Sequence, residues 1–193
     1  MPPPACPAST EEKSLNHTTL LMKAAFRAAT WHSAQRRKGT AAEPYINHLL
    51  EVANLVAEAT GGDDTNLVVA ALLHDAVEDQ PVSRATIAAE FGEEVAAVVM
   101  EVTDDKSLPK AERKRLQIEN APHKSPRASI IKVADKISNL RALASSPPAD
   151  WPMERQLAYV QWARDVVARL PVDNAFLLRN FAEAADAAEQ AAG

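Results

Sequence analysis

The strongest constraint on the fold is a helical pattern that continues from Leu15 almost to the C-terminus. Ala, Leu, Glu and Arg dominate this stretch, and the whole chain contains only five glycines. No segment alternates apolar and polar residues as a half-buried strand would. We therefore expect an all-α domain over residues 15–193. Residues 1–14 are rich in Pro, Ser and Thr and poor in bulky apolar groups, which predicts a disordered tail.

Start and stop signals divide the domain into about eight helices. Gly61-Gly62 is a typical C-terminal stop, and Ser125-Pro126 combines an N-cap with a proline at the first helical position. Ser83 and Asp173 are suited to be N-caps of later helices. The expected helices are residues 16–36, 47–59, 64–78, 83–92 continued by 93–103, 109–121, 125–144, 152–170 and 173–193.

Composition excludes several classes of function. A formal net charge of −5 and a pI near 5.6 argue against binding to a nucleic-acid polymer, but they leave room for a local basic patch that binds a phosphorylated small molecule. The single Cys6 cannot form an internal disulfide. No apolar run approaches the roughly 18 residues of a membrane span, and the N-terminus lacks the pattern of a signal peptide. We expect a soluble cytoplasmic protein.

The segment AALLHDAVEDQ, residues 70–80, places four ionisable side chains directly after an aliphatic run. Since residues four apart share a helix face, His74 should lie above Glu78, and Asp75 above Asp79, at the edge of a partly buried crevice. Charges in such a place need compensation, which a divalent metal would supply while a second carboxylate handles an attacking water. A His-Asp pair alone also recurs by chance at solvated helix ends. The segment therefore indicates a metal site only if further ligands exist.

Two other residues have a sequence context suited to completing such a site. His48 ends the segment PYINH at the start of an expected helix, and Asp135 lies within the apolar run IIKVADKISNL. Asp135 could instead pair with a neighbour such as Lys132. A mixed set of imidazoles and carboxylates suits manganese, iron, zinc or magnesium, and the set here is His48, His74, Asp75 and Asp135. The remaining histidines are expected at the surface or at helix boundaries: His17, His32 and His123.

Two basic runs flank these candidates. Arg37 and Lys38 precede a glycine and adjoin the PYINH segment, so we expect them to bind substrate. In the charged helix PKAERKRLQIENA, the residues Arg113–Arg115 are interspersed with glutamates, which favours a solvated face. Lys110 and this helix could nevertheless supply further cations.

The order His48, His74-Asp75 with Glu78-Asp79, and then Asp135 is that of the HD-domain metal-dependent phosphohydrolases. From about residue 20 to 170 the chain resembles the hydrolase domain of the RelA/SpoT homologue family, above all its stand-alone small alarmone hydrolases of the metazoan SpoT homologue type. The resemblance implies a single HD-domain helical bundle. It rests on QRRKGTAAEPYINH, AALLHDAVED, FGEEVAAVVMEVTDDKSLPKAERKRLQIENAPHKSP, IKVADKISNLRAL and the residues Trp151, Arg155, Tyr159 and Trp162.

This resemblance also implies a reaction and assigns residues to it. The reaction is removal of the 3′-diphosphate of ppGpp and pppGpp, which gives GDP or GTP and pyrophosphate, with one Mn²⁺ ion as the usual metal. The implied metal ligands are His48, His74, Asp75 and Asp135, and the implied water-activating pair is Glu78 and Asp79. The implied substrate-binding residues are Arg37, Lys38, Lys110, Asn139, Arg155 and Tyr159. Without the resemblance, Tyr159 would be interpreted as a core aromatic.

Two positions depart from the family pattern, because Leu49 replaces a common proline and Gln80 a common threonine. Neither change removes a catalytic group. The chain is too short to hold the alarmone-synthesising domain as well, so we expect it only to degrade alarmones.

Two alternative classes of function stay open. One is hydrolysis of another nucleotide with a phosphorylated ribose, above all NADPH at its 2′-phosphate. The other, from a different class, is a non-catalytic alarmone sensor or a helical interaction module.

Overall fold

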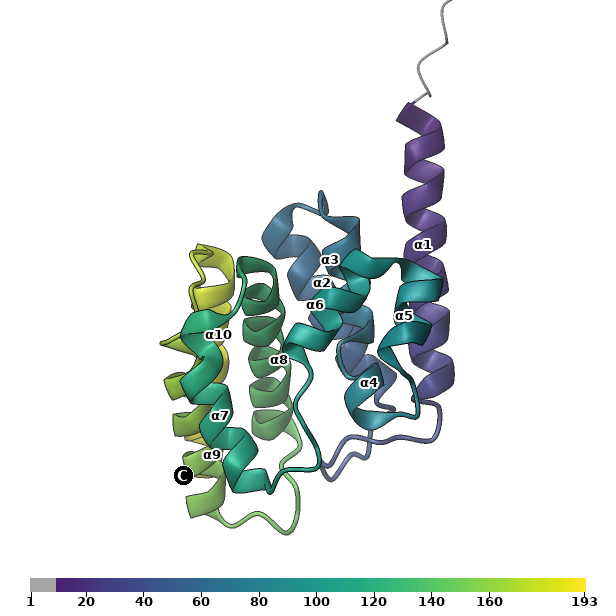
Figure 1. Ribbon diagram of the computed structural model, residues 1–193. Coiled ribbons are helices and arrows are strands. Elements are labelled where there is room, and N and C mark those ends of the chain that lie inside the picture. Colours follow the sequence, from purple (N-terminus) through teal and green to yellow (C-terminus); the bar gives the residue numbers. More distant parts are fainter. Residues whose placement is uncertain (1–9) are drawn as a thin grey trace, which may run out of the picture.

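The computed structural model describes residues 10–193, with side chains from His17 onward, and the regular elements in that part of the chain are helices (Figure 1). The expected all-α class is confirmed. The helices are α1 (Thr10–Trp31), α2 (Ile46–Thr60), α3 (Thr65–Leu73), α4 (Ala76–Asp79), α5 (Arg84–Phe91), α6 (Glu93–Val102), α7 (Lys110–Asn120), the 3-10 helix η1 (Ala121–His123), α8 (Pro126–Ser145), α9 (Met153–Val167) and α10 (Ala175–Ala192). Residues 1–9 of the predicted tail lie outside the described residues. No helix within residues 10–193 is long and apolar enough to cross a membrane.

Helix α8 is the central element of the bundle. Ser125 caps its N-terminus by accepting a hydrogen bond from the Ala128 N–H, and Pro126 occupies the first position. The helix packs against α2, α6, α9 and α10. Figure 1 shows α8 with α7, α9 and α10 on one side and α2, α3 and α6 on the other. Because its neighbours surround it, polar residues of α8 such as Asp135 lie inside the protein.

The first expected helix differs at both ends from α1, which begins at Thr10 and ends at Trp31 rather than running from Asn16 to Arg36. The helix ends at Trp31 because backbone groups of the following residues form hydrogen bonds outside the helix. Gln35 N–H donates to the His32 carbonyl at 3.0 Å in a turn, and its own carbonyl accepts from Tyr45 N–H at 3.1 Å. The basic residues 36–38 therefore lie in a loop that folds back on the start of α2.

The expected helix 64–78 is not continuous, because it breaks after Leu73 and resumes as α4. The reason is local: His74 Nδ1 donates to the Ala71 carbonyl oxygen at 2.8 Å. In an uninterrupted α-helix that oxygen would accept from the Asp75 N–H. The break falls within the His-Asp pair and turns both side chains toward the inside of the bundle. The other helix boundaries differ from expectation by a few residues, as at the last helix, where Asn174 is the N-cap instead of Asp173.

Candidate active site

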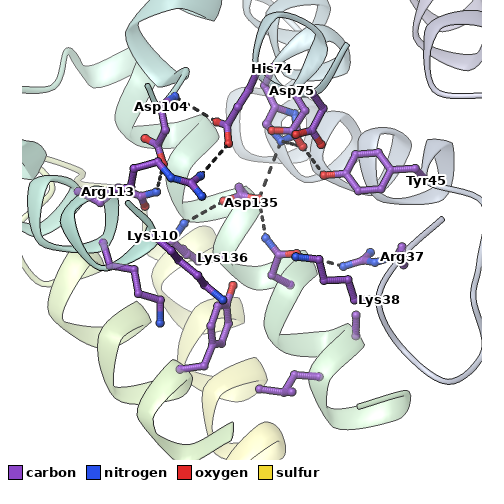
Figure 2. A pocket seen from close by; sticks show the side chains of 18 of the residues that line it. Arg37, Lys38, Tyr45, His74, Asp75, Asp104, Lys110, Arg113, Asp135 and Lys136 are labelled. Carbon is purple, nitrogen blue, oxygen red and sulfur yellow. Dashed lines mark hydrogen bonds and ion pairs between the residues drawn. The ribbon is translucent and has the colours of Figure 1, made fainter. Parts of the chain in front are cut away.

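A cavity of about 500 Å³ opens beside α8, and the loop after α1, α4, the loop before α7, α7 itself and α9 complete its wall (Figure 2). Among the described residues, nine Lys or Arg and five Asp or Glu side chains line it. The chain as a whole carries a net charge of −5. The cavity is therefore a positively charged depression in an acidic protein, which favours anionic ligands.

The four predicted metal ligands meet at one side of this cavity. His48 Nε2 lies 3.4 Å from Asp135 Oδ1 and 3.6 Å from Asp75 Oδ2. His74 Nε2 lies 3.2 Å from Asp75 Oδ2 and 3.8 Å from Asp135 Oδ1. One ligand atom from each of His48, His74 and Asp135 lies within 4.8 Å of the others. This convergence of side chains from α2, the α3–α4 junction and α8 forms a candidate site for a divalent metal.

Hydrogen bonds direct Nε2 of both histidines to the shared centre. His48 Nδ1 lies 2.8 Å from Ser138 Oγ, whose own proton goes to Glu51 Oε2 at 2.6 Å, so His48 Nδ1 is the donor. His74 Nδ1 donates to the Ala71 carbonyl, and its buried Nε2 makes no hydrogen bond within the described part of the chain. A histidine held through Nδ1 keeps the Nε2 lone pair for a metal ion. The donor set thus fits a divalent cation.

The electrostatics of the cluster also favour a cation. Burial acts against ionisation of the two aspartates, but His74 and His48 hold the pKa of Asp75 well below its usual range. Lys136 and the same histidines do so for Asp135. Burial lowers the pKa of His74, yet the two carboxylates outweigh it and raise that pKa to about 10. A site that binds a proton so firmly stabilises positive charge, and a metal ion would compete with the proton.

Glu78 and Asp79, the predicted water-activating pair, lie beside this cluster and face in different directions. Glu78 Oε2 accepts from the Asp104 N–H at 3.1 Å, and its Oε1 lies 3.6 Å from Arg113 Nη1. Burial raises the pKa of Glu78, and the charge of Asp75 adds to the rise. The continuous helix on which His74 was expected to lie above Glu78 is interrupted between the two residues.

Asp79 is held through both of its carboxylate oxygens. Its Oδ2 accepts from Gln35 Nε2 at 2.6 Å, and Lys106 Nζ contacts Oδ1. Neither partner was expected from the sequence, since Gln35 lies 44 residues and Lys106 lies 27 residues from Asp79.

A family model described as "HD domain" matches residues 24–170.

The chain belongs to the HD-domain family.

Individual proteins that are similar to this HD-domain protein confirm the resemblance to the alarmone hydrolases that was found in the sequence. The guanosine-3′,5′-bis(diphosphate) 3′-pyrophosphohydrolase MESH1 of Xenopus tropicalis is 48% identical over 158 residues, which are 82% of this chain and 88% of that protein. The Homo sapiens protein of the same name is 47% identical over 154 residues, 80% and 86% of the two chains. A solved structure, described as a metazoan ortholog of SpoT that hydrolyzes ppGpp, matches with a TM-score of 0.82 and 42% identity over 93% of this chain and 96% of that one.

Arg37 was predicted to bind substrate. Its side chain is largely buried against α8 of this HD-domain protein. Its guanidinium donates to Ser138 Oγ and to the Ser138 carbonyl, both at 3.1 Å, and to Asn139 Oδ1 at 3.3 Å. Asn139, another predicted substrate residue, donates in turn to Asp135 Oδ1 at 2.7 Å. The two residues therefore connect the basic loop to the metal cluster, and Arg37 still lines the cavity.

Three further predicted substrate residues line the cavity: Lys38, Lys110 and Tyr159. Burial raises the pKa of Tyr159 to about 12, so the phenol is neutral at pH 7. Arg155 is not among the lining residues. Its guanidinium lies 4.4 Å from the ring centroid of Trp151, which does line the cavity, and so Arg155 supports the wall from outside.

Helix α7 contributes more to the site than its sequence suggested. The expected solvated face is right for Arg115, which pairs with Glu112 and Glu119. It is wrong for Arg113 and Lys114, which line the cavity. Burial and the neighbouring cations lower the pKa of Lys114 to about 8. The signal was available, because the α7 residues in the cavity wall have the i, i+3, i+4, i+7 spacing of one helix face: Lys110, Arg113, Lys114 and Gln117.

Two further expectations concern His32 and Asp135. His32 lies at a helix boundary, directly after the end of α1 at Trp31, which is one of its two expected placements; it is 2% exposed and stacks on Tyr45, with ring centroids 5.3 Å apart. The ordinary partner of Asp135 is Lys136, at 3.0 Å, and not Lys132, which lies 3.6 Å from Asp104 instead.

The loop that carries Arg37 and Lys38 is fastened to the C-terminal end of α8. The Ala41 N–H donates to Ser146 Oγ at 2.8 Å. A Cβ atom on Gly39 would lie 2.1 Å from the Ser146 carbonyl oxygen, so only glycine allows this approach.

Proposed function

We propose that this HD-domain protein is a metal-dependent guanosine-3′,5′-bis(diphosphate) 3′-pyrophosphohydrolase. It converts ppGpp into GDP, and pppGpp into GTP, with release of pyrophosphate. The observation that carries the proposal is a basic cavity in which a His-His-Asp-Asp cluster adjoins two further carboxylates, those of Glu78 and Asp79. Relatives that share more than 40% of the sequence bear this activity in their names, which supports the choice of substrate.

We further propose Mn²⁺ as the resident metal, held by His48, His74, Asp75 and Asp135. Two imidazoles and two carboxylates suit Mn²⁺ but also iron, zinc or magnesium, so the choice of manganese rests on the family resemblance. When bound, the metal would lower the pKa of a coordinated water and polarise a phosphoryl oxygen.

The residues of the chain itself supply the proton transfers and the charge neutralisation. Hydrolysis forms a bond from the water oxygen to the phosphorus next to O3′, breaks the P–O3′ bond, and leaves O3′ protonated. We propose that Asp79 accepts the proton of the water and that Glu78 orients that water. The negative charge of the diphosphate is met by the basic residues of the wall, among them Lys38, Lys110 and Lys114.

An aromatic wall next to these lysines suits a purine nucleotide. Tyr159 lies between Trp151 and Trp162, with ring centroids 5.7 Å and 5.3 Å away. Lys114 Nζ lies 4.5 Å from the centroid of Trp162. Flat apolar surfaces beside cations match a ligand that combines a planar base with phosphates. A cavity of about 500 Å³ has the size of a small-molecule site. We accordingly propose a free nucleotide as the substrate. We also propose a cytoplasmic location, because the chain has a single cysteine.

Steady-state kinetics with one metal on two substrates tests the function. The Mn²⁺-loaded protein should release pyrophosphate from ppGpp with a higher kcat/KM than it releases phosphate from NADPH. A much higher kcat/KM for NADPH would replace the proposal by an NADPH 2′-phosphatase. Tight ppGpp binding without pyrophosphate release would replace it by an alarmone sensor.

The pH dependence of kcat/KM should reveal Glu78. Because burial raises the pKa of Glu78 above the ordinary 4.5, its carboxylate takes up a proton earlier as the pH falls. The acidic limb of the profile should therefore lie above pH 4.5 in the wild-type protein and disappear in Glu78→Gln, which should also lose about 10²-fold in rate. Glu112→Gln, on the outer side of α7, is the control. An acidic limb that persists unchanged in Glu78→Gln would show that another group produces it.

A further inference from the structure

The side chain of Gln35 contacts the carboxylate proposed to accept the proton. Its Nε2 donates to Asp79 Oδ2 at 2.6 Å. The Gln35 backbone is fixed on both sides, because its N–H donates to the His32 carbonyl and its carbonyl accepts from the Tyr45 N–H. A donor that is held in this way can determine where the Asp79 carboxylate points.

The other end of the Gln35 amide meets the side chains of Gln80 and His32. Gln80 Nε2 donates to Gln35 Oε1 at 2.6 Å, and His32 Nδ1 lies 2.7 Å from the same oxygen. A flipped amide would turn Oε1 toward the Asp79 carboxylate, so that two acceptors face each other, and its NH₂ group toward the NH₂ group of Gln80. The Gln35 amide therefore has one favourable orientation, which is the one that donates to Asp79.

Lys106, the second partner of Asp79, is held much less firmly. It lies in the loop between α6 and α7, and its side chain is 47% exposed. An exposed lysine on the cavity wall can exchange a carboxylate for the phosphate of an arriving substrate. Gln35, enclosed by Gln80 and His32, keeps its contact with Asp79 when that exchange occurs.

We propose that Gln35 is a positioning residue for the hydrolysis, which fixes the Asp79 carboxylate toward the attacking water, and that Gln80 holds Gln35 in place. This inference rests on the proposed function, in which Asp79 accepts the proton. It adds a residue that lies outside the proposed metal cluster and outside the predicted set of substrate-binding residues. The rate depends on it because a catalytic group misplaced by about 1 Å can cost about 10²-fold.

Gln35→Met removes the hydrogen bond and nearly preserves the side-chain length. For ppGpp we expect kcat to fall about 10- to 100-fold, with little change in KM and with the metal content and melting temperature of the wild-type protein. Gln80→Met leaves Gln35 present and should cause a smaller loss in kcat of the same kind. The matched control is Gln161→Met, since Gln161 also donates to an aspartate, Asp165, at 2.9 Å, but on the exposed side of α9.

A double-mutant cycle decides whether Gln35 acts through Asp79. In an Asp79→Asn background, Gln35→Met should change the residual kcat by less than about 2-fold, because groups that act as a unit are not additive. A repeated full loss in that background would overturn the proposal, and so would a rise in KM with unchanged kcat.

The Gln80→Met protein keeps the test decisive if Gln35→Met does not fold. An unchanged kcat in Gln80→Met would then overturn the inference. The wild-type protein, measured in the same assay, tests the proposed function separately: absence of pyrophosphate release from ppGpp would refute that function, whereas an active wild type with an unaffected Gln35→Met would refute only the role of Gln35.

Discussion

Asp79→Asn should lower kcat for ppGpp by about 10²- to 10⁴-fold, the usual contribution of a general base. Asparagine preserves the size of the side chain, and its oxygen can still accept from Gln35, but the amide cannot take up a proton from water. Metal content should equal that of the wild-type protein, because Asp79 lies outside the four-residue cluster. Kinetics on ppGpp combined with metal analysis measures both effects.

Asp165→Asn is the matched control for this experiment, since Asp165 also accepts from a glutamine amide and lies on the exposed side of α9. It should retain the wild-type kcat. A metal-loaded Asp79→Asn protein that hydrolyses ppGpp at the wild-type rate would show that another group accepts the proton, and Glu78 would be the nearest candidate.

Asp135→Ala should lose the bound metal and at least about 10³-fold in kcat/KM, because metal-assisted charge stabilisation contributes several kcal/mol to such reactions. The change removes the carboxylate that approaches both histidines. Metal analysis of the purified protein gives the first readout, and pyrophosphate release gives the second. A verified metal-free Asp135→Ala protein with wild-type activity would contradict the assignment of the cluster.

The alanine variant also leaves Lys136 buried without its carboxylate partner, and uncompensated buried charge costs about 3–5 kcal/mol. Asp135→Asn leaves Lys136 unpaired as well, but it separates the loss of charge from the loss of side-chain volume. It keeps the side-chain volume but removes the negative charge that binds a cation. Thermal unfolding of both variants should therefore be measured beside their metal content.

Much of the fold was predictable because its signals are local. Ser83, Ser125 and the glycine after α2 cap their helices as expected. The end of α1 and the break after Leu73 were not predictable from helical periodicity. Both depend on particular hydrogen bonds, from the Tyr45 N–H to the Gln35 carbonyl and from the His74 ring to the Ala71 carbonyl. The first joins residues ten apart in sequence, and the second is a side chain competing with the helix backbone.

The candidate site likewise has one part that was predictable from the sequence and one part that was not. The residues of the cluster follow from short motifs, and the structure brings them together. Their supporting partners carry no motif of their own: Tyr45 donates to Asp75 from 30 residues away, at 2.6 Å, and Lys106 reaches Asp79 from a loop. Single-residue contacts between distant segments leave no periodic pattern. The cavity face of α7 is different, because its helical spacing was visible in the sequence.

The tight approach of Gly39 to Ser146 has a consequence for selectivity. It joins the basic loop to α8, and Arg37 adds hydrogen bonds to Ser138 and Asn139 of the same helix. Asp135 lies one turn earlier on α8, so the spacing between the guanidinium and the metal cluster is set by a single helix. The protein is thus preorganised for a fixed distance between two negatively charged parts of one ligand. Discrimination among phosphate chains would then arise from this built-in spacing, without a domain closing around the nucleotide.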